Sequence, residues 1–159
     1  MTRQQFISYI ESNQRALRRF LTALCCGDSS LADDIAQETL MKAYLNCDNF
    51  RQDSKFSTWI YRIAYNTFIS SRRRERVTDP ISCASELAAC ERADKSFEYQ
   101  HLYKALDDLS EKERTAILLF YMQGYDISEI AEITETSADT VKQHLSRGRR
   151  HLRALLTED

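Results

Sequence analysis

Turn-forming residues are scarce in this chain of 159 residues, which has three glycines and one proline. An all-β fold with many hairpins needs such residues at its turns, so that fold is not expected here. The long stretches without a helix breaker favour α-helices instead. The sequence therefore predicts an all-α protein, with room for one ordinary domain or two small ones.

The chain also lacks long apolar runs and metal-ligand motifs. No stretch is long enough to span a membrane, and the polar N-terminus carries no apolar signal segment. The five cysteines form no C-x-x-C pair, and none of the three histidines is spaced from a cysteine pair as a zinc site requires. We therefore expect no membrane insertion, no metal and no cofactor, and free thiols in a reducing cytoplasm.

Charge is divided into blocks, although the net charge is only −2. Residues 1–76 carry a net charge of +4 and residues 140–159 of +3, whereas residues 77–95 carry −2 and residues 96–139 carry −7. Two basic blocks suggest two contacts with a polyanion such as DNA. Solvated helix faces would produce the same blocks, so charge alone does not decide between the two interpretations.

Apolar residues at helical spacing predict a first module of three helices in residues 1–76, the last of them at about 56–74. The segment 77–95 holds the only proline and no strong apolar stripe, so we interpret it as a linker. Residues 96–159 predict a second helical module, which ends in a helix-turn-helix. Within it Ser110-x-x-Glu113 has the pattern of a capping box.

The last helix, from Ala138 to about Leu156 with Ser137 as its cap, is both basic and amphipathic. Lysine and arginine reach phosphates, and arginine, lysine and glutamine also read base edges in the major groove. A plain basic hairpin, or a helix that binds an acidic protein or membrane surface, remains an alternative. The candidate DNA-binding residues are Ser137, Thr140, Lys142, Gln143, Ser146, Arg147, Arg150 and Arg153.

Aromatic, amide and cationic side chains are mixed along the third helix and in the loop before it, residues 48–55. Such a mixture suits the unstacked bases of a single strand. We favour core packing for Trp59, which adjoins apolar residues, and we expect Tyr61, beside Arg62, to be exposed. The candidates for this second nucleic-acid contact are Asn49, Phe50, Arg51, Lys55, Tyr61, Arg62, Asn66 and Arg73.

Three motifs follow one another along nearly the whole chain. They are LADDIAQETL at residues 31–40, FRQDSKFSTWIYRIA at residues 50–64, and the set IAE, TVK and LSRGR within residues 130–149. In order and spacing they resemble the bacterial RNA polymerase sigma factors of the extracytoplasmic-function (ECF) group. Three separate motifs make this resemblance more specific than a lone helix-turn-helix.

The resemblance implies a sigma factor that binds core RNA polymerase and directs promoter recognition and DNA opening. Residues 1–76 would be its region 2-like module, in which loop 48–55 and the third helix capture the −10 element. Residues 96–159 would be its region 4-like helix-turn-helix, which reads the −35 element. Further implied partners are the β flap of the polymerase and an anti-sigma factor. The implied dock for the β′ clamp helices consists of Asp33, Asp34, Gln37 and Glu38.

A few positions depart from the family pattern. Glu135 stands where the turn usually has a small residue, and Gln143 and His144 replace what are more often serine and arginine. Gly148 replaces a common alanine, which is expected to cost roughly 1 kcal/mol of helix stability if the position is exposed. These departures bear on which −35 sequence is read, not on the role of the helix.

Three other functions compete with this interpretation. A stand-alone helix-turn-helix regulator of operator DNA would need a dimerisation face and leaves residues 31–76 unexplained. An enzyme would need a nucleophile elbow, a phosphate loop or a metal cluster, none of which is present, so we expect no catalytic residues. A thiol redox sensor would use Cys25 and Cys26 or Cys83 and Cys90, but free cysteines are more often inert core residues.

Overall fold

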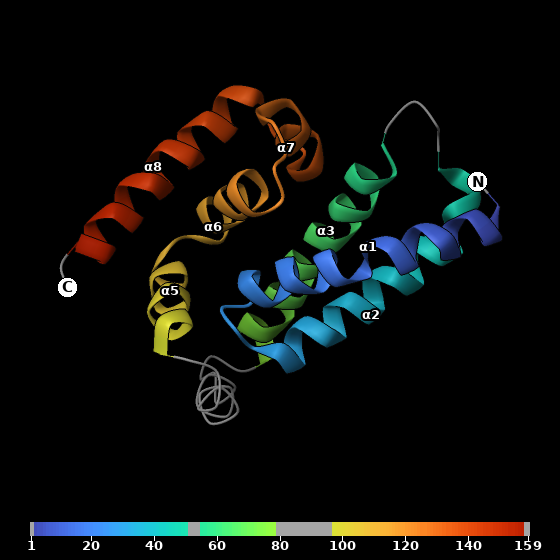
Figure 1. The fold of residues 1–159 in the computed structure, drawn as a ribbon, viewed down its shortest axis with the longest axis horizontal. Helices are drawn as coiled ribbons and strands as arrows, with labels where there is room; N and C mark the ends of the chain where they lie inside the picture. The colour runs from blue at the N-terminus through green and yellow to red at the C-terminus, as the bar shows by residue number, and fades with distance from the viewer. Residues whose placement is uncertain (1, 51–54, 79–96, 158–159) are drawn as a thin grey trace.

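The computed structural model describes residues 2–50, 55–78 and 97–157, and within them the chain is all-α, as the sequence predicts. Residues 79–95 of the expected linker, and Arg51, lie outside the described residues. Figure 1 shows the elements in space. In chain order they are α1 (Arg3–Leu24), α2 (Ser29–Leu45), the 3-10 turn η1 (Cys47–Asn49), α3 (Phe56–Thr78), α5 (Phe97–Asp108), α6 (Glu111–Ile117), the π-helical turn η2 (Leu118–Met122), α7 (Ile127–Thr134) and α8 (Ala138–Thr157).

Side-chain caps fix where most of these helices begin. Thr2 and Gln5 form a reciprocal capping box at α1, and the Asp28 carboxylate accepts a hydrogen bond from the Leu31 amide at the start of α2. Each cap satisfies a backbone donor that has no partner inside its helix. The caps of α6, α7 and α8 are Ser110, Asp126 and Ser137, which accept from the amides of Glu113, Glu129 and Thr140.

The N-terminal module is a bundle of α1, α2 and α3. Helices α1 and α2 form an antiparallel pair, and α3 packs against α2 (Figure 1). The core between them is apolar and contains several side chains with no measurable exposure. Its members include Leu17, Phe20, Leu21, Leu24, Ile35, Ala36, Ile60, Ala64 and Phe68.

The C-terminal module places α8 across α6 and α7. The turn between α7 and α8 reverses at Glu135, which has φ 56° and ψ 43°. This left-handed conformation costs a residue with a Cβ atom roughly 1–2 kcal/mol, which explains why a small residue is more usual at this position. The departure from the family pattern therefore strains the turn.

The capping box predicted for α6 is only half right. The Ser110 hydroxyl accepts from the Glu113 amide at 3.2 Å, but the Glu113 carboxylate turns away from the cap. Its Oε2 lies 3.0 Å from Nδ1 of His151 on α8, and Glu113 is 8% exposed. The carboxylate therefore ties α8 to α6 instead of closing the start of its own helix.

Gly148 is a contact residue, which corrects the expectation of an exposed weak point. It is buried in α8 against α6. A Cβ atom built on it would lie 2.8 Å from Cγ1 and 3.1 Å from Cδ1 of Ile117. Glycine therefore lets the two helices approach more closely than alanine would, and this approach sets the position of α8.

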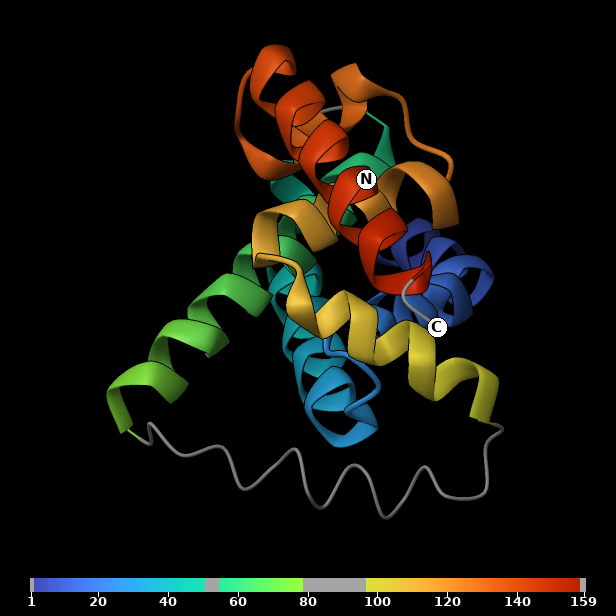
Figure 2. The same ribbon diagram turned by 90° about the vertical axis from the view of Figure 1, so that its left-hand side faces the viewer.

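The two modules pack directly against each other. Helix α3 contacts α7, and α1 contacts η2, α5 and α6. Figure 1 shows α8 at one edge of the molecule and α2 at the opposite edge, with α3 between them, and Figure 2 shows the C-terminal end of α3 projecting from the body. The described chain is thus a closed arrangement of two modules, not a pair of separate bodies.

The close approach at Gly148 predicts that Gly148→Ala changes the stability of the protein in opposite directions, depending on whether residue 117 is isoleucine or alanine. Gly148→Ala gains about 1 kcal/mol of helix propensity but overpacks Ile117, which costs about 1–3 kcal/mol, so the substitution should destabilise the wild-type protein. In an Ile117→Ala background both clashing atoms are gone, and the same substitution should stabilise by about 1 kcal/mol. Urea unfolding of the four proteins measures both changes. If Gly148→Ala changed the free energy of unfolding in the same direction in both proteins, Gly148 would not have the proposed packing role.

Candidate nucleic-acid interface

Helix α8 presents its polar and basic side chains to solvent along one side. Val141, Leu145 and Gly148 are buried against the rest of the module, which fixes the rotation of the helix about its axis. The Ser137 and Thr140 hydroxyls lie 2.8 Å apart in the cap at its N-terminus. Six of the predicted DNA-binding residues lie on the solvent side, and all are exposed: Lys142, Gln143, Ser146, Arg147, Arg150 and Arg153.

Arg149 is engaged within the protein. Its Nε donates to the Tyr121 hydroxyl at 2.6 Å, and its guanidinium lies 5.6 Å from the ring centroids of both Phe120 and Tyr121. A cation held over two aromatic rings gives up an attractive contact if it moves to a phosphate. We therefore separate Arg149 from Arg150 and Arg153, which have no such contact with η2.

His144 of α8 adds little positive charge to this surface. Burial and the nearby Lys112 and Arg147 lower the pKa of His144 from its ordinary value, although Glu113 opposes them. His144 is therefore neutral at pH 7. Nδ1 of His151 lies 3.0 Å from the Glu113 carboxylate. Lysine and arginine supply the positive charge of the solvent-exposed side.

A pocket of about 400 Å³ opens where α2 ends and α3 passes it. Asn46, Asn49 and Asn66 bring three amide groups to its wall, and Trp59 brings an aromatic ring. Amides donate and accept hydrogen bonds, so they can match the edge of a base, while an aromatic ring can stack on it. The complete lining is Lys42, Asn46, Asn49, Trp59, Ile63, Asn66 and Thr67.

The prediction for Tyr61 is wrong, whereas that for Trp59 holds in part. Tyr61 is 4% exposed, its ring packs 5.2 Å from Phe20 and 5.4 Å from Tyr125, and burial raises the pKa of its hydroxyl. Trp59 is half-buried and packs against the core, but it also lines the pocket. It lies three and seven residues before Arg62 and Asn66 and therefore shares their face of the helix.

The remaining candidates of the first module lie around the pocket or on the same side of α3. Asn49, Asn66 and Arg73 are exposed, Arg62 is half-exposed, and Phe50 packs its ring against Trp59 at 5.2 Å. Lys55 is largely exposed and lies 3.6 Å from Glu129 of α7. Arg51 belongs to the residues that the structure does not describe.

The acidic residues of α2 have unequal surroundings. Arg18 holds Asp33 at 2.8 Å, and Glu38 lies 3.3 Å from Lys42 and 3.5 Å from Arg74. Asp34 and Gln37 are exposed on the outer face of the helix. Met41 and Leu45 continue that face and are 65% and 73% exposed, a feature that the sequence patterns did not single out.

The adjacent cysteines Cys25 and Cys26 are poorly suited to redox sensing. Burial raises the pKa of Cys25 to about 12 and that of Cys26 to about 11, with Asp28 and Asp107 adding to the respective shifts. Both thiols therefore stay protonated at pH 7, and a protonated thiol reacts slowly. Cys83 and Cys90 lie outside the described residues. In the described part of the chain, no group of three His, Cys, Asp or Glu side chains is arranged to hold a metal, and no helix is long and apolar enough to cross a membrane.

Known families match both modules. Residues 9–78 match the family model for sigma-70 region 2, and residues 99–152 match that for sigma-70 region 4. The chain is 33% identical to the ECF RNA polymerase sigma factor EcfG of Rhodopseudomonas palustris, over 91% of this chain and 81% of that one. It is 35% identical to the ECF RNA polymerase sigma factor SigW of Bacillus subtilis, over 83% of this chain and 79% of that one.

Solved structures agree with these matches. The sigma factor RpoE of Bartonella quintana, in complex with the anti-sigma factor NepR, superposes with a TM-score of 0.80 at 29% identity, over 98% of this chain and 99% of that one. CnrH, in complex with the cytosolic domain of CnrY, has the same fold, with a TM-score of 0.74 at 23% identity over 99% and 91% of the two chains. Taken with the exposed basic side of α8, these matches decide against a stand-alone operator-binding regulator: the chain belongs to the ECF group of RNA polymerase sigma factors, the transcription initiation factors that bind core polymerase and promoter DNA.

Proposed function

We propose that the two modules divide promoter recognition between them. Residues 1–76 dock on core polymerase and capture the −10 element, residues 96–159 read the −35 element, and residues 77–95 link them. The observation that carries this division is the solvent-exposed basic side of α8, which lies in a different module from the amide-lined pocket beside α3. The chain performs no catalytic step of its own and acts in the cytoplasm, where the polymerase is.

The N-terminal half of α8 is the part that enters the major groove. In a helix-turn-helix the first residues of the second helix contact base edges. Lys142, Gln143, Ser146 and Arg147 occupy that half, while Arg150 and Arg153 lie further along and reach phosphates. Ser137 and Thr140, whose hydroxyls already hold the cap, are placed to meet the backbone near the helix start.

The pocket beside α3 receives a base that has left the stack. Its volume and its mixture of amides with one aromatic wall fit a nucleobase and its hydrogen-bonding edge. Lys42 at the wall and Arg62 and Arg73 along α3 supply the positive charge that the flanking phosphates need. Tyr61 is removed from this set because it is buried between the modules.

The outer face of α2 is the polymerase dock, with Asp34 and Gln37 as its accessible polar residues. Asp33 pairs with Arg18 and Glu38 pairs with Arg74, so their charges are partly neutralised within the protein and are less available to a partner. We also propose the β flap as a partner of the C-terminal module and an anti-sigma factor as a regulator. The likeness of the whole chain to a sigma factor in complex with NepR supports the latter.

Charge reversal at Asp34 tests the dock. Asp34→Lys should weaken binding to core polymerase by about tenfold or more, because a cation then faces the partner's complementary surface. Glu11→Lys makes the same charge change at an exposed position of α1 and should bind like the wild type. Native-gel titration with core enzyme measures both affinities. Equal affinities for the two variants would place the dock elsewhere.

Removal of one pocket amide tests the capture of an unstacked base. Asn66→Ala should weaken binding of the polymerase holoenzyme to a fork-junction probe with an unpaired −10 strand by about fivefold, the effect of one lost hydrogen bond. Asn13→Ala removes an exposed amide from α1 and should change nothing. An Asn66→Ala holoenzyme that binds the unpaired probe normally would exclude the pocket as the base site.

The different roles proposed along α8 predict that two alanine substitutions weaken DNA binding in different ways. Arg147→Ala should cost about 1–3 kcal/mol on the cognate −35 site and relax one base position. Arg153→Ala should weaken binding to all −35 sequences alike and lower the slope of log K against log salt by about 1, because a phosphate contact carries no sequence information. Titration against a small library of −35 sites at two salt concentrations separates them. A change of preference in Arg153→Ala, with a uniform loss in Arg147→Ala, would invert the assignment.

A further inference from the structure

Helix α8 crosses α6, and the crossing lies next to the part of α8 that carries the proposed DNA contacts. Gly148 packs against Ile117, and a Cβ atom built on it would lie 3.6 Å from the Glu113 carbonyl oxygen. Nδ1 of His151 lies 3.0 Å from the Glu113 carboxylate. The turns of α8 on either side of Gly148 therefore run over the first residues of α6.

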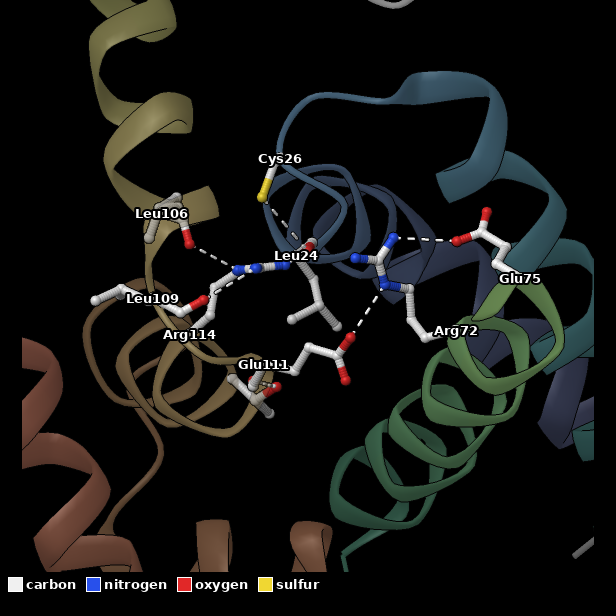
Figure 3. A network of polar contacts seen from close by, with 9 residues as sticks. Leu24, Cys26, Arg72, Glu75, Leu106, Leu109, Glu111 and Arg114 are labelled. Carbon is white, nitrogen blue, oxygen red and sulfur yellow. Dashed lines mark hydrogen bonds and ion pairs between the residues drawn. The ribbon is translucent and has the colours of Figure 1, made fainter. Parts of the chain in front are cut away.

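The first turn of α6 is held in place by its own side chains. Glu111 accepts from Arg72 of α3 at 3.1 Å, and the buried Arg114 donates to three backbone carbonyls (Figure 3). Glu113 is buried and faces α8. Lys112 differs from these three because it is exposed and makes no hydrogen bond or ion pair with any described residue. A firmly held turn thus presents a cation to solvent.

His144 of α8 lies beside this lysine. It is half-buried and stands one turn before Gly148, on the flank of α8 that meets α6. Burial lowers the pKa of His144, and the positive charges of Lys112 and Arg147 lower it further, although Glu113 opposes them. Two cations, one from each helix, are therefore close enough to the imidazole ring to act on its charge.

Helical phase places these groups at the edge of the base-reading surface. Successive residues of an α-helix are about 100° apart around its axis, so His144 lies about 60° from Arg147. His144 is on the side of Arg147 that leads toward the buried Val141, and the exposed Arg150 is on the other side. Lys112 and His144 therefore border the exposed surface of α8 along the flank that faces α6.

The chemistry of this border suits a phosphate. A helix that enters the major groove has backbone phosphates on both sides of it. Lysine offers a positive charge with three N–H donors, and imidazole offers one donor when neutral and two when protonated. The Glu113 carboxylate is buried and directed at His151, so an anion that approaches from solvent meets the two donors before it meets the acid.

We infer that Lys112 of α6 and His144 of α8 together bind one phosphate of the −35 duplex, next to the base that Arg147 reads. The inference rests on the proposed function for the entry of α8 into the major groove. It adds a contact from α6, which lies outside the helix-turn-helix formed by α7 and α8. Lys112 belongs to the acidic block of residues 96–139, so the distribution of charge along the sequence does not point to it.

A bound phosphate changes the surroundings of His144. Its negative charge favours the imidazolium form and offsets Lys112 and Arg147, so the pKa of His144 is higher in the complex than in the free protein. A group of this kind takes up a proton as the complex forms. Affinity for DNA therefore rises as the pH falls through the pKa of the complex, and it levels off below the pKa of the free protein. Because the latter is lower than the ordinary value of about 6.5, the rise is expected between about pH 8 and pH 6.

Neutral phosphate analogues test the contact itself. The full chain is titrated with a set of −35 duplexes, each of which carries one methylphosphonate in place of one phosphate. At one position this change should weaken wild-type binding by about fivefold but Lys112→Ala binding by less than about twofold, because the lysine contact is already gone. Lys104→Ala removes an exposed lysine from α5 and should keep the full loss. If every methylphosphonate acted equally on the wild type and Lys112→Ala, the phosphate site would be wrong.

A pH series tests the part of His144. The wild type should bind the −35 duplex about fivefold more tightly at pH 6 than at pH 8. His144→Gln should lose most of this dependence. His144→Arg, a permanent cation, should bind at pH 8 about as tightly as the wild type does at pH 6. His101→Gln changes an exposed histidine of α5 and should retain the wild-type dependence. A dependence that survived in His144→Gln would remove His144 from the site.

The same titrations separate failure of the phosphate site from failure of the proposed function. If Lys112→Ala and His144→Gln bound every duplex like the wild type, while Arg147→Ala still relaxed one base position, α8 would read the −35 element without this site. If the wild type did not distinguish a −35 duplex from an unrelated one, the proposed role of α8 would fail. The methylphosphonate comparison would then still decide whether Lys112 contacts the DNA backbone.

Discussion

The arrangement of the C-terminal module depends on the buried guanidinium of Arg114. A buried cation is costly unless its donors are satisfied, and here three backbone carbonyls satisfy it without any carboxylate. Two of these carbonyls, Leu24 and Leu106, belong to the last turns of helices, where carbonyls carry the negative end of the helix dipole. Without the guanidinium, the Leu106 carbonyl would keep only the Leu109 amide at 3.1 Å, and the Leu24 carbonyl only the long contact with the Cys26 thiol at 4.0 Å. The Arg114 side chain therefore fixes both the angle between α5 and α6 and the position of α6 against α1.

The position of α8 follows in turn from α6. Gly148 allows α8 to approach Ile117 closely, and the Glu113 carboxylate meets His151 further along the same pair of helices. These two contacts, with the burial of Val141 and Leu145, fix the rotation of α8, so that the basic residues face outward together. Gly148, which lowers helix propensity, and Glu113, which has the spacing of a capping residue, thus both help to set the orientation of α8. Helix propensity and capping are local properties, and neither contains information about which helix lies opposite.

Much of the fold and site followed from the sequence because helices, caps and motif order are local or nearly local. The helix-turn-helix, the Ser137 cap and the outward basic side of α8 are of this kind. The error at Tyr61 and the missed place of Trp59 in the pocket wall came from judging each residue by its immediate neighbours, although the helical period already groups Trp59 with Asn66 and Tyr61 with Tyr65 and Phe68. Contacts between modules were beyond such reasoning. Nothing near Tyr61 in the sequence points to Gln123, and nothing near Arg72 points to Glu111, because tertiary packing alone brings these pairs together.

The acidic block of residues 96–139 is partly neutralised by the first module. Its net charge of −7 lies on the scaffold that carries α8, whereas the exposed side chains of α8 are largely basic. Two of these acids, Glu111 and Glu129, are partnered by Arg72 and Lys55 of the basic first module. The charge blocks of the sequence therefore meet across the boundary between the modules: acids of the second module pair with cations of the first, and the cations of α8 remain exposed to solvent.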